Sequence, residues 1–535
     1  MKQKYKFKNE IDKARFIALM VFIGIITLLA WQSDDAYHGY VMSKHLVEGN
    51  GLVYNIGERA SASSCPLFTL IISAAYFMTR EMYFTSIFVC VAFSSAAFYI
   101  VIYKLCKNKE QVFFSLAALI GSSAFVSYTT SGLENSLLFF LCTLFLKLYF
   151  DNETYTGKQL LSMALVFSAV ALARMDAVLM LIPMICFAFL VKRKNTTFFG
   201  AVGIGLLGLS PFILWEVFST FYFGFPVPNT AYVKLGTDIA LIEYIKRGIW
   251  YIIFTSLNDI MVLIIPVVFI IFTIFLKKAK YIYTSAGVAL YFLYIIYIGG
   301  DFMMGRHFTV LLIISLSSFI VFQNKEKEDF VSVRKTRNIF NVIVIGSIIY
   351  SFTFVPVIGS QYLFGHQFSS SISDEREVYS KTTGFYNNIK SLIETGELCV
   401  KDTWNYQSTD EIRENGLIGN ITDNSPGILV FYNSDLYLND AYGLGDPFLS
   451  KLPAIKDENW RVGHMKREIP SGYRETVQFG KNIIEDENLH EYYEIIRTMT
   501  RGDLFSKERI QTVIDWNLGK YDYLLENYEK SILGN

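Results

Sequence analysis

Two adjacent carboxylates, Asp34 and Asp35, follow the first long apolar run and open an amphipathic segment at Ala36–Val47. If that segment is helical, His38 and His45 lie about one and three turns further on. Carboxylates near imidazoles are suited to acid–base chemistry or to binding a divalent cation. The alternative is a helix start, because acidic side chains are favourable at a helix N-terminus.

A second candidate is Arg174 with Asp176, at the centre of an apolar tract at 159–191 that is too long for one membrane span. A hairpin with its turn at Arg174–Asp176 would resolve this length. Arginine binds phosphate through paired hydrogen bonds, so we expect Arg174 to face an anionic lipid phosphate. A local ion pair at the turn is the alternative.

A third candidate is the glycine-rich segment Gly299–His307, which contains Asp301, Arg306 and His307 within seven residues. They supply an acid, a fixed cation and a titratable ring. Glycines permit close approach of the backbone, and a phosphate site at the start of the following helix fits this pattern.

Three further polar residues stand beside apolar runs. Glu134 precedes such a run, where a carboxylate is also favourable simply because a helix begins there. Asn229 and Lys234 belong to a proline-containing segment at 226–234, for which a plain turn is the alternative.

The elements that must position these residues follow from the composition. The chain has 535 residues, 52% hydrophobic and 18% charged, whereas a soluble domain carries roughly 25% charged residues. The composition therefore argues against a globular cytosolic enzyme. The net charge of zero gives no support for a nucleic-acid partner. Six cysteines, four of them in or beside apolar runs, do not form a disulfide framework.

Long apolar runs predict a polytopic α-helical membrane protein with about eleven spans. The predicted spans are Phe16–Trp31, Met82–Tyr103, Gln111–Thr129, Asn135–Phe150, Gln159–Ala173, Ala177–Val191, Phe198–Phe218, Asp259–Leu276, Tyr281–Ile298, Phe308–Phe322 and Asn338–Pro356. Two shorter apolar stretches, Pro66–Met78 and Ile242–Ser256, are expected to lie in the membrane interface.

Lys and Arg in the connecting segments predict the orientation. With the N-terminus in the cytoplasm, the inner segments hold 22 Lys and Arg residues and the outer segments before the tail hold 8. We therefore expect a multi-pass protein of the plasma (inner) membrane. An odd number of spans places the C-terminus outside.

The composition changes after Pro356, which predicts a membrane domain at 1–360 and a soluble extracytoplasmic domain at 361–535. The tail is charged and rich in Asn, Gly and Tyr. Gly427–Tyr432 is strand-like and Tyr523–Ile532 is helical in pattern, so we expect a mixed α/β domain.

The ordered set of polar motifs resembles the GT-C glycosyltransferases, and among them most the mycobacterial terminal β-(1,2)-arabinofuranosyltransferase group. The resemblance covers most of the chain. Its motifs are Asp34–Tyr37, Leu46–Arg59, Cys65–Leu67, Gly132–Asn135, Ala173–Asp176, Asn229–Lys234, Gly300–His307, Asp440–Pro447, Trp460–His464 and Pro470–Tyr473.

The resemblance implies transfer of a sugar, for example a pentofuranose such as arabinofuranose, from a polyprenyl-phosphate donor to a cell-envelope glycan. It implies Asp34 as the catalytic carboxylate, with Asp35 orienting it or binding a divalent cation. The residues implied for the donor phosphate are Arg174, Arg306 and His307. Those implied for the rest of the substrate are Tyr37, Glu134, Asp176, Asn229, Lys234 and Asp301. Those implied for the acceptor glycan are Asp440, Asp446 and His464.

Two other functions remain open from the sequence. A ligase or polymerase acting on lipid-linked oligosaccharides would share the topology and the leaving group. A lipid-linked oligosaccharide flippase would also carry charges inside a helical bundle, although its charges are expected on both membrane faces. The stereochemistry is open as well: Asp34 is a base if the reaction inverts, and a nucleophile or ion-pair shield if it retains.

Overall fold

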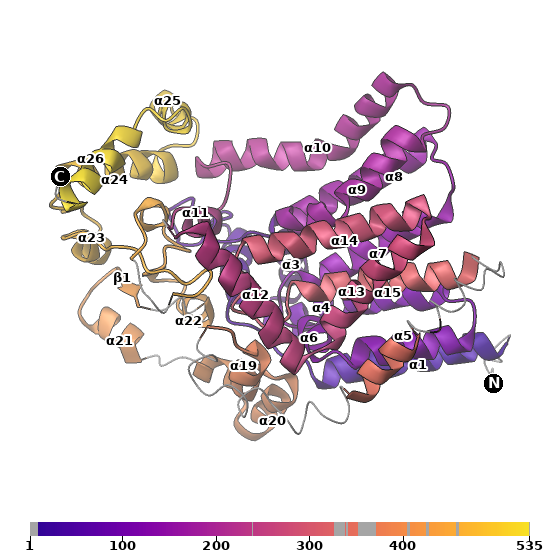
Figure 1. The fold of residues 1–535 in the computed structure, drawn as a ribbon. Coiled ribbons are helices and arrows are strands. Elements are labelled where there is room, and N and C mark those ends of the chain that lie inside the picture. Colours follow the sequence, from indigo (N-terminus) through magenta and orange to yellow (C-terminus); the bar gives the residue numbers. More distant parts are fainter. Residues whose placement is uncertain are drawn as a thin grey trace. The chain divides into compact units, whose positions relative to one another are not determined.

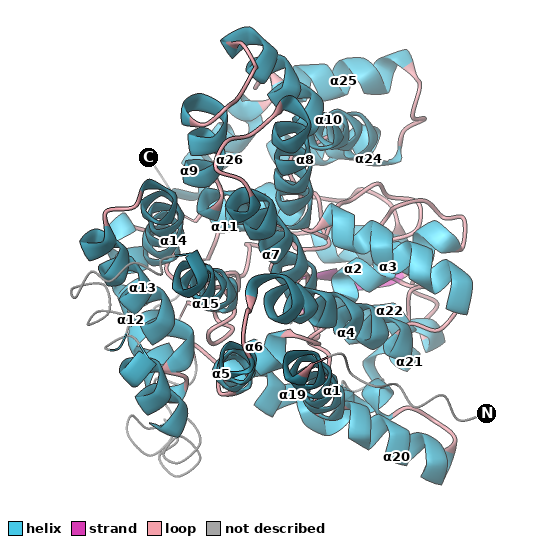
Figure 2. Ribbon diagram, turned by 90° about the vertical axis from the view of Figure 1, so that its right-hand side faces the viewer, coloured by secondary structure: helices cyan, strands magenta, loops and turns pink. Residues whose placement is uncertain are grey.

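The computed structural model describes residues 9–237, 239–325, 338, 341–350, 371–403, 407–423, 427–455 and 460–533. The described residues are mostly helical (Figures 1 and 2). They divide into two compact units, each built from three stretches of chain. The first is Met1–Gln32, Ile87–Pro211 and Ala240–Val378, and the second is Ser33–Ser86, Phe212–Ile239 and Tyr379–Asn535. The domain boundary expected near residue 360 lies outside the described residues.

The described residues of the first unit are mostly helical. Its helices include α1 (Glu10–Leu28), η1 (Ile100–Leu105), α5 (Lys109–Ile120), α6 (Ser123–Tyr128), α7 (Asn135–Asp151), α8 (Gly157–Ala173), η2 (Met175–Met180), α9 (Ile182–Cys186), η3 (Phe187–Val191), α12 (Leu241–Asn258), α13 (Met261–Leu276), α14 (Ala279–Tyr297), α15 (Phe308–Lys325) and a short helix at Asn341–Tyr350. Three more helices contain residues of both units: α4 (Tyr83–Tyr99), α10 (Phe198–Phe223) and α19 (Glu375–Thr383).

Helix α15 lies at the centre of the first unit, packed against α7, α13 and α14 (Figures 1 and 2). From Phe308 to Phe322 its side chains are buried almost without interruption. A helix that is apolar all round is expected to be buried on every side. The packing of α15 therefore explains its sequence.

The number of membrane spans is only partly supported. Among the described residues, three helices are long and apolar enough to cross a membrane: Tyr83–Leu105, Phe198–Phe223 and Ala279–Tyr297. Helices α12 and α13 could form a fourth as a pair bent by 111°. Other apolar helices are shorter than the roughly 20 residues that a span needs. The count of about eleven spans is therefore not confirmed.

One predicted span, Gln111–Thr129, is two helices. Helix α5 ends at Ile120, and Ser122 caps α6 by accepting a hydrogen bond from the Phe125 amide at 3.0 Å. The Asp259 carboxylate accepts from the Ser122 hydroxyl at 2.6 Å and from the Ala124 amide at 2.8 Å. The prediction was wrong because this buried acid, distant in the sequence, stabilises a new helix start.

The hairpin expected at Arg174–Asp176 is present. Helix α8 ends at Ala173, Arg174 is extended, and the 3₁₀ helix η2 begins at Met175. The two ends of the tract meet again, since the Tyr155 amide donates to Lys192 O at 2.9 Å and the Lys194 amide donates to Tyr155 O at 2.8 Å.

The second unit joins an N-terminal segment to the C-terminal part of the chain. Its helices are α2 (Ala36–Val47), α3 (Pro66–Thr79), α11 (Asn229–Leu235), α20 (Phe385–Thr395), η4 (Cys399–Thr403), α21 (Gln407–Glu414), α22 (Gly427–Tyr432), η5 (Leu449–Lys451), α23 (Tyr473–Phe479), α24 (Glu487–Arg501), α25 (Lys507–Asn517) and α26 (Asp522–Leu533). Within the described residues, β1 (Gly419–Thr422) and β2 (Tyr437–Asp440) form a two-stranded parallel sheet, with Gly419 opposite Tyr437.

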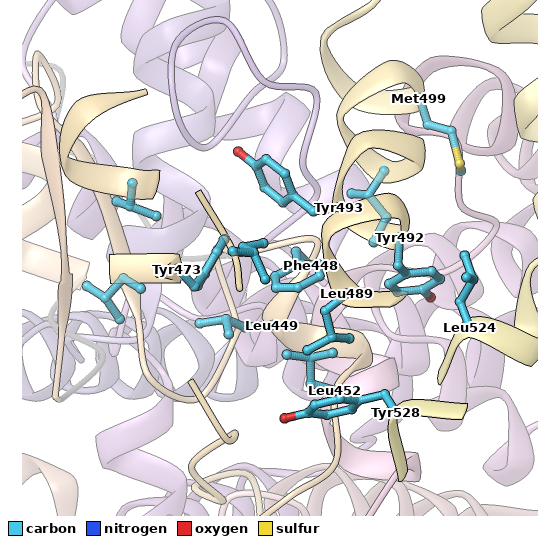
Figure 3. Packing of buried hydrophobic residues seen from close by; sticks show 14 of the residues in the cluster. Phe448, Leu449, Leu452, Tyr473, Leu489, Tyr492, Tyr493, Met499, Leu524 and Tyr528 are labelled. Atoms are coloured by element: carbon cyan, nitrogen blue, oxygen red, sulfur yellow. The ribbon is translucent and has the colours of Figure 1, made fainter. Parts of the chain in front are cut away.

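The core of the second unit lies among α23, α24, α26 and the segment around η5 (Figure 3). It is rich in tyrosine and leucine. The residues labelled in Figure 3 are Phe448, Leu449, Leu452, Tyr473, Leu489, Tyr492, Tyr493, Met499, Leu524 and Tyr528. Most of this apolar interior comes from the C-terminal part of the chain, and Phe225 joins it from the segment before α11.

Polar contacts explain why the segment after Asp35 belongs to the second unit. Glu58 accepts from the Tyr437 hydroxyl at 2.7 Å and from Arg501 Nε at 3.0 Å. The Asn55 side chain donates to Asn439 Oδ1 at 2.7 Å. Buried polar groups need such partners, so this segment and the C-terminal part of the chain stabilise each other.

The predictions for individual elements of this unit were mixed. Helices α2 and α26 confirm the expected helices at Ala36–Val47 and Tyr523–Ile532. The strand-like interpretation of Gly427–Tyr432 was wrong, because this segment is helix α22. A short apolar run without polar interruption has no periodicity that separates a strand from a helix.

Candidate functional site

Six of the residues singled out in the sequence form one cluster in the first unit, which we call the arginine cluster. They come from three separate segments: the start of α7, the α8–η2 junction and the α14–α15 loop. Its members are Glu134, Arg174, Asp176, Asp301, Arg306 and His307.

Glu134 is shared by the two arginines. Its Oε1 lies 2.7 Å from Arg174 Nη1 and 3.0 Å from Arg306 Nη2, and its Oε2 lies 3.1 Å from Arg306 Nη2. Burial alone would raise the pKa of Glu134, but Arg306 and Arg174 outweigh it and hold this pKa at about 2. Glu134 is therefore ionised and bridges two fixed cations.

The other two carboxylates of the cluster also have basic partners. Arg174 Nε donates to Asp176 Oδ1 at 2.8 Å, so the local ion pair considered for this turn is present. Asp301 Oδ2 lies 3.2 Å from His307 Nε2 and 3.8 Å from Arg306 Nη1. Burial, and then the charge of Arg174, lower the pKa of His307, which keeps this imidazole neutral at neutral pH.

Tyr291 joins the cluster from helix α14 and was not predicted. Its hydroxyl lies 3.0 Å from His307 Nδ1 and 3.2 Å from Asp176 Oδ2. It is fully buried. The sequence around it contains Tyr294 and Tyr297 at helical spacing, and nothing local separates the tyrosine that meets polar partners from its neighbours.

Two glycines bring the α14–α15 loop into place. Gly300 and Gly305 have φ of 79° and 70°, values that favour glycine. A Cβ on Gly300 would lie 2.5 Å from Tyr251 Cβ, and one on Gly305 would lie 2.7 Å from Ala124 Cβ. The close backbone approach expected from these glycines is confirmed, and it positions Asp301, Arg306 and His307.

The cluster is most exposed at Arg174, Asp176 and Arg306. The side chains of Arg174 and Asp176 are each 17% exposed and that of Arg306 is 12% exposed, against 4% for Glu134 and 3% for His307. An anion reaching the cluster would therefore meet the guanidinium groups of Arg174 and Arg306 together with the Asp176 carboxylate, which is as exposed as Arg174. Guanidinium groups bind phosphate and carboxylate with the same paired geometry, so such an anion would compete with Glu134.

The carboxylates at the start of α2 lie in the second unit. Asp34 is buried, and its Oδ2 and Oδ1 accept from the Gly427 and Ile428 amides, each at 2.9 Å. It thus caps α22. Asp35 is half-buried and begins α2 without a side-chain capping bond among the described residues. Both carboxylate oxygens of Asp34 accept hydrogen bonds from backbone amides, whereas the Asp35 carboxylate makes no capping hydrogen bond to the described residues of α2.

The neighbouring aromatic and histidine side chains are buried around these acids. Tyr37 packs edge-on against Phe431. His38 Nδ1 lies 3.0 Å from the Tyr54 hydroxyl, and His45 Nδ1 lies 3.1 Å from Val53 O. Throughout the described part of the chain, no three His, Cys, Asp or Glu side chains are grouped so that they could hold a metal ion.

Asn229 and Lys234 lie at the two ends of α11 in the second unit. Asn229 is buried, and its Oδ1 is 3.5 Å from the Ser450 hydroxyl. Lys234 is exposed. Neither belongs to the arginine cluster as defined above.

Two of the residues that the resemblance implies for binding the acceptor glycan, Asp440 and Asp446, accept hydrogen bonds from backbone amides. Asp440 accepts from the Tyr442, Leu444 and Gly445 amides at 3.0–3.2 Å. Asp446 accepts from two backbone amides and from the Tyr473 hydroxyl, the last at 2.6 Å. Burial, and then the nearby Glu58, raise the pKa of Asp446 to about 7.

His464 is the third residue implied for the acceptor, and it is half-buried. Its ring packs edge-on against Tyr442, with 5.3 Å between the ring centroids.

No protein-family model, curated protein or solved structure matches this chain.

Proposed function

We propose that this protein is a polytopic membrane glycosyltransferase of GT-C type. It moves a sugar, such as a pentofuranose, from a polyprenyl-phosphate donor to a cell-envelope glycan outside the cytoplasm. The observation that carries the proposal is the arginine cluster, in which Arg174 and Arg306 converge on the single carboxylate of Glu134.

The chemistry of the donor requires such a group. When the sugar leaves, the polyprenyl phosphate gains negative charge, and fixed cations stabilise that charge. Two guanidinium groups directed at one carboxylate define an anion position, and a phosphate presents oxygens of the same spacing. In this proposal the guanidinium groups of Arg174 and Arg306 bind the donor phosphate, and His307 lies beside them.

A lipid-linked donor also requires a membrane. Three helices of sufficient length and apolarity, and a bent pair that could be a fourth, support membrane insertion. We retain the expectation of about eleven spans from the apolar runs. The distribution of Lys and Arg predicts a cytoplasmic N-terminus and an extracytoplasmic C-terminal domain.

The acceptor hydroxyl needs a carboxylate that takes its proton. The two candidates are Asp34 and Asp35. Both oxygens of Asp34 accept backbone hydrogen bonds, which favours a structural role for it. We therefore assign proton acceptance to Asp35 and the capping of helix α22 to Asp34.

The test is transfer of radiolabelled sugar from a panel of polyprenyl-phosphate pentoses and hexoses, in membranes that contain equal amounts of each variant. Wild type is expected to label glycan, and Arg306→Gln is expected to lose the activity because its charge no longer stabilises the leaving group. Arg497→Gln, at a half-exposed pair with Glu494, is the matched control and should retain activity.

The nearest alternative is a ligase or polymerase that moves a whole lipid-linked oligosaccharide, because it would need the same phosphate site. Loss of label transfer from every single-sugar donor, with transfer from a lipid-linked oligosaccharide, would favour it. Movement of the lipid across the bilayer without any glycosidic bond formed would favour a flippase.

A further inference from the structure

The arginine cluster carries more negative than positive groups. It contains three carboxylates against two guanidinium groups, and His307 is neutral for the reasons given above. A phosphodiester anion would add a second uncompensated charge to a largely buried site, which is costly. A positive charge must therefore accompany it.

A hydrogen-bonded chain of four side chains can supply that charge as a proton. It runs from Asp301 Oδ2 to His307 Nε2 at 3.2 Å and from His307 Nδ1 to the Tyr291 hydroxyl at 3.0 Å. It ends with the Tyr291 hydroxyl and Asp176 Oδ2 at 3.2 Å. Both ring nitrogens of His307 are thus within hydrogen-bond distance of an oxygen.

The two protonation states of His307 use this chain differently. A neutral ring donating from Nε2 to Asp301 accepts the Tyr291 proton at Nδ1, which leaves that hydroxyl without a proton for Asp176. A doubly protonated ring donates from Nδ1 to the Tyr291 oxygen, and Tyr291 then donates to Asp176. The cationic ring therefore satisfies every contact of the chain.

Arg174 is the group that opposes this cation. Its Nη2 lies 3.3 Å from His307 Nε2 and 3.4 Å from His307 Nδ1. The other charged groups near the ring are Asp301 from its own loop and Asp176 from η2. Arg306 lies beside Asp301, and Glu134 lies between the two arginines. The neutral Tyr291 hydroxyl faces the ring from α14. An anion bound to Arg174 would offset the guanidinium charge and favour protonation.

We propose that binding of a phosphodiester at the arginine cluster is coupled to uptake of one proton by His307, with Tyr291 as the positioning residue that accepts the new N–H. This inference rests on the proposed function, because it assumes that the cluster binds the donor phosphate. Because linkage is reciprocal, the anion must bind more tightly as pH falls.

The test is calorimetric titration of the full-length protein in detergent with dibutyl phosphate, a phosphodiester whose charge is constant between pH 6 and 8. Buffers of different ionisation enthalpy report the protons taken up. Wild type is expected to take up close to one proton when it binds dibutyl phosphate at pH 7.5. Its affinity for this anion should fall by up to about tenfold for each unit by which the pH is raised.

Tyr291→Phe keeps the ring and removes the hydroxyl, so it should bind with clearly less proton uptake and a flatter pH dependence. The matched control is Tyr294→Phe, one turn along α14, whose ring stacks on Tyr291. It should retain the wild-type uptake.

Binding without proton uptake, or full uptake in Tyr291→Phe, would overturn this inference and leave the donor-phosphate role intact. Binding that requires Mg²⁺ and takes up no proton would overturn it in favour of a cation. No binding at any pH would overturn both this inference and the donor-phosphate role.

Discussion

Glu134 is the residue on which both arginines of the cluster depend. We predict that Glu134→Gln lowers stability by about 1–3 kcal/mol, because two nearly buried guanidinium groups lose their shared charge partner. An added phosphodiester should then raise the melting temperature of this variant more than that of wild type, since it restores the missing charge.

Thermal melting in detergent, with and without dibutyl phosphate, measures both effects. Glu494→Gln, at the exposed pair with Arg497, is the control and should melt like wild type. An equal shift for Glu134→Gln and wild type would mean that the anion does not replace this carboxylate.

We predict that Asp34 contributes to stability and Asp35 to catalysis. Asp34→Asn should cost about 1–2 kcal/mol, because an amide cannot accept both backbone hydrogen bonds at the start of α22. Asp35→Asn should leave the melting temperature near that of wild type and abolish sugar transfer. Normal transfer by Asp35→Asn would return the catalytic role to Asp34 or to an acid of the arginine cluster.

At the scale of elements, the α14–α15 loop depends on Gly300. Gly300→Ala combines an unfavourable positive φ with a Cβ 2.5 Å from Tyr251 Cβ. Gly49→Ala is the matched control, because its φ is 88° and nothing lies within 4 Å of its Cβ position.

We expect Gly49→Ala to cost about 1–2 kcal/mol from backbone strain alone, and Gly300→Ala to cost clearly more. Melting temperatures of the two variants decide this. Equal losses would show that the loop moves away from Tyr251 without difficulty, and that the glycine is not what holds Arg306 and His307 in place.

The sequence was informative where a polar residue stood out against apolar neighbours. Arg174, Arg306 and His307 were identified in this way, and the hairpin at Arg174 followed from tract length. Tyr291 was missed because one tyrosine among several on an apolar helix carries no local signal. The break before α6 was missed because the acid that stabilises it, Asp259, lies more than a hundred residues away.

Helix α22 shows the same limitation at its N-terminus. This apolar run of six residues, five of them buried, is equally compatible with a strand. The helix is capped by Asp34, almost four hundred residues earlier. Long-range contacts of this kind decide local structure without leaving a trace in the local pattern.

At the scale of the whole molecule, the orientation in the membrane is the main prediction. Lys194 and Lys507 are both exposed, and the charge distribution predicts that Lys194 lies in the cytoplasm and Lys507 outside. A membrane-impermeant maleimide should therefore label Lys507→Cys in intact cells and Lys194→Cys only after permeabilisation, measured above the wild-type background. The reverse pattern would place the C-terminal domain in the cytoplasm, away from an external glycan.

The central claim is that Arg174 and Arg306 hold the phosphate of a lipid-linked sugar donor. The most direct measurement is photo-cross-linking with a polyprenyl-phosphate sugar that carries a diazirine on its first isoprene unit, followed by peptide mapping. We predict cross-links near Arg174 and within Gly299–His307 that unlabelled donor competes away and Arg306→Gln abolishes. Competable cross-links confined to other segments, unchanged in Arg306→Gln, would contradict the claim.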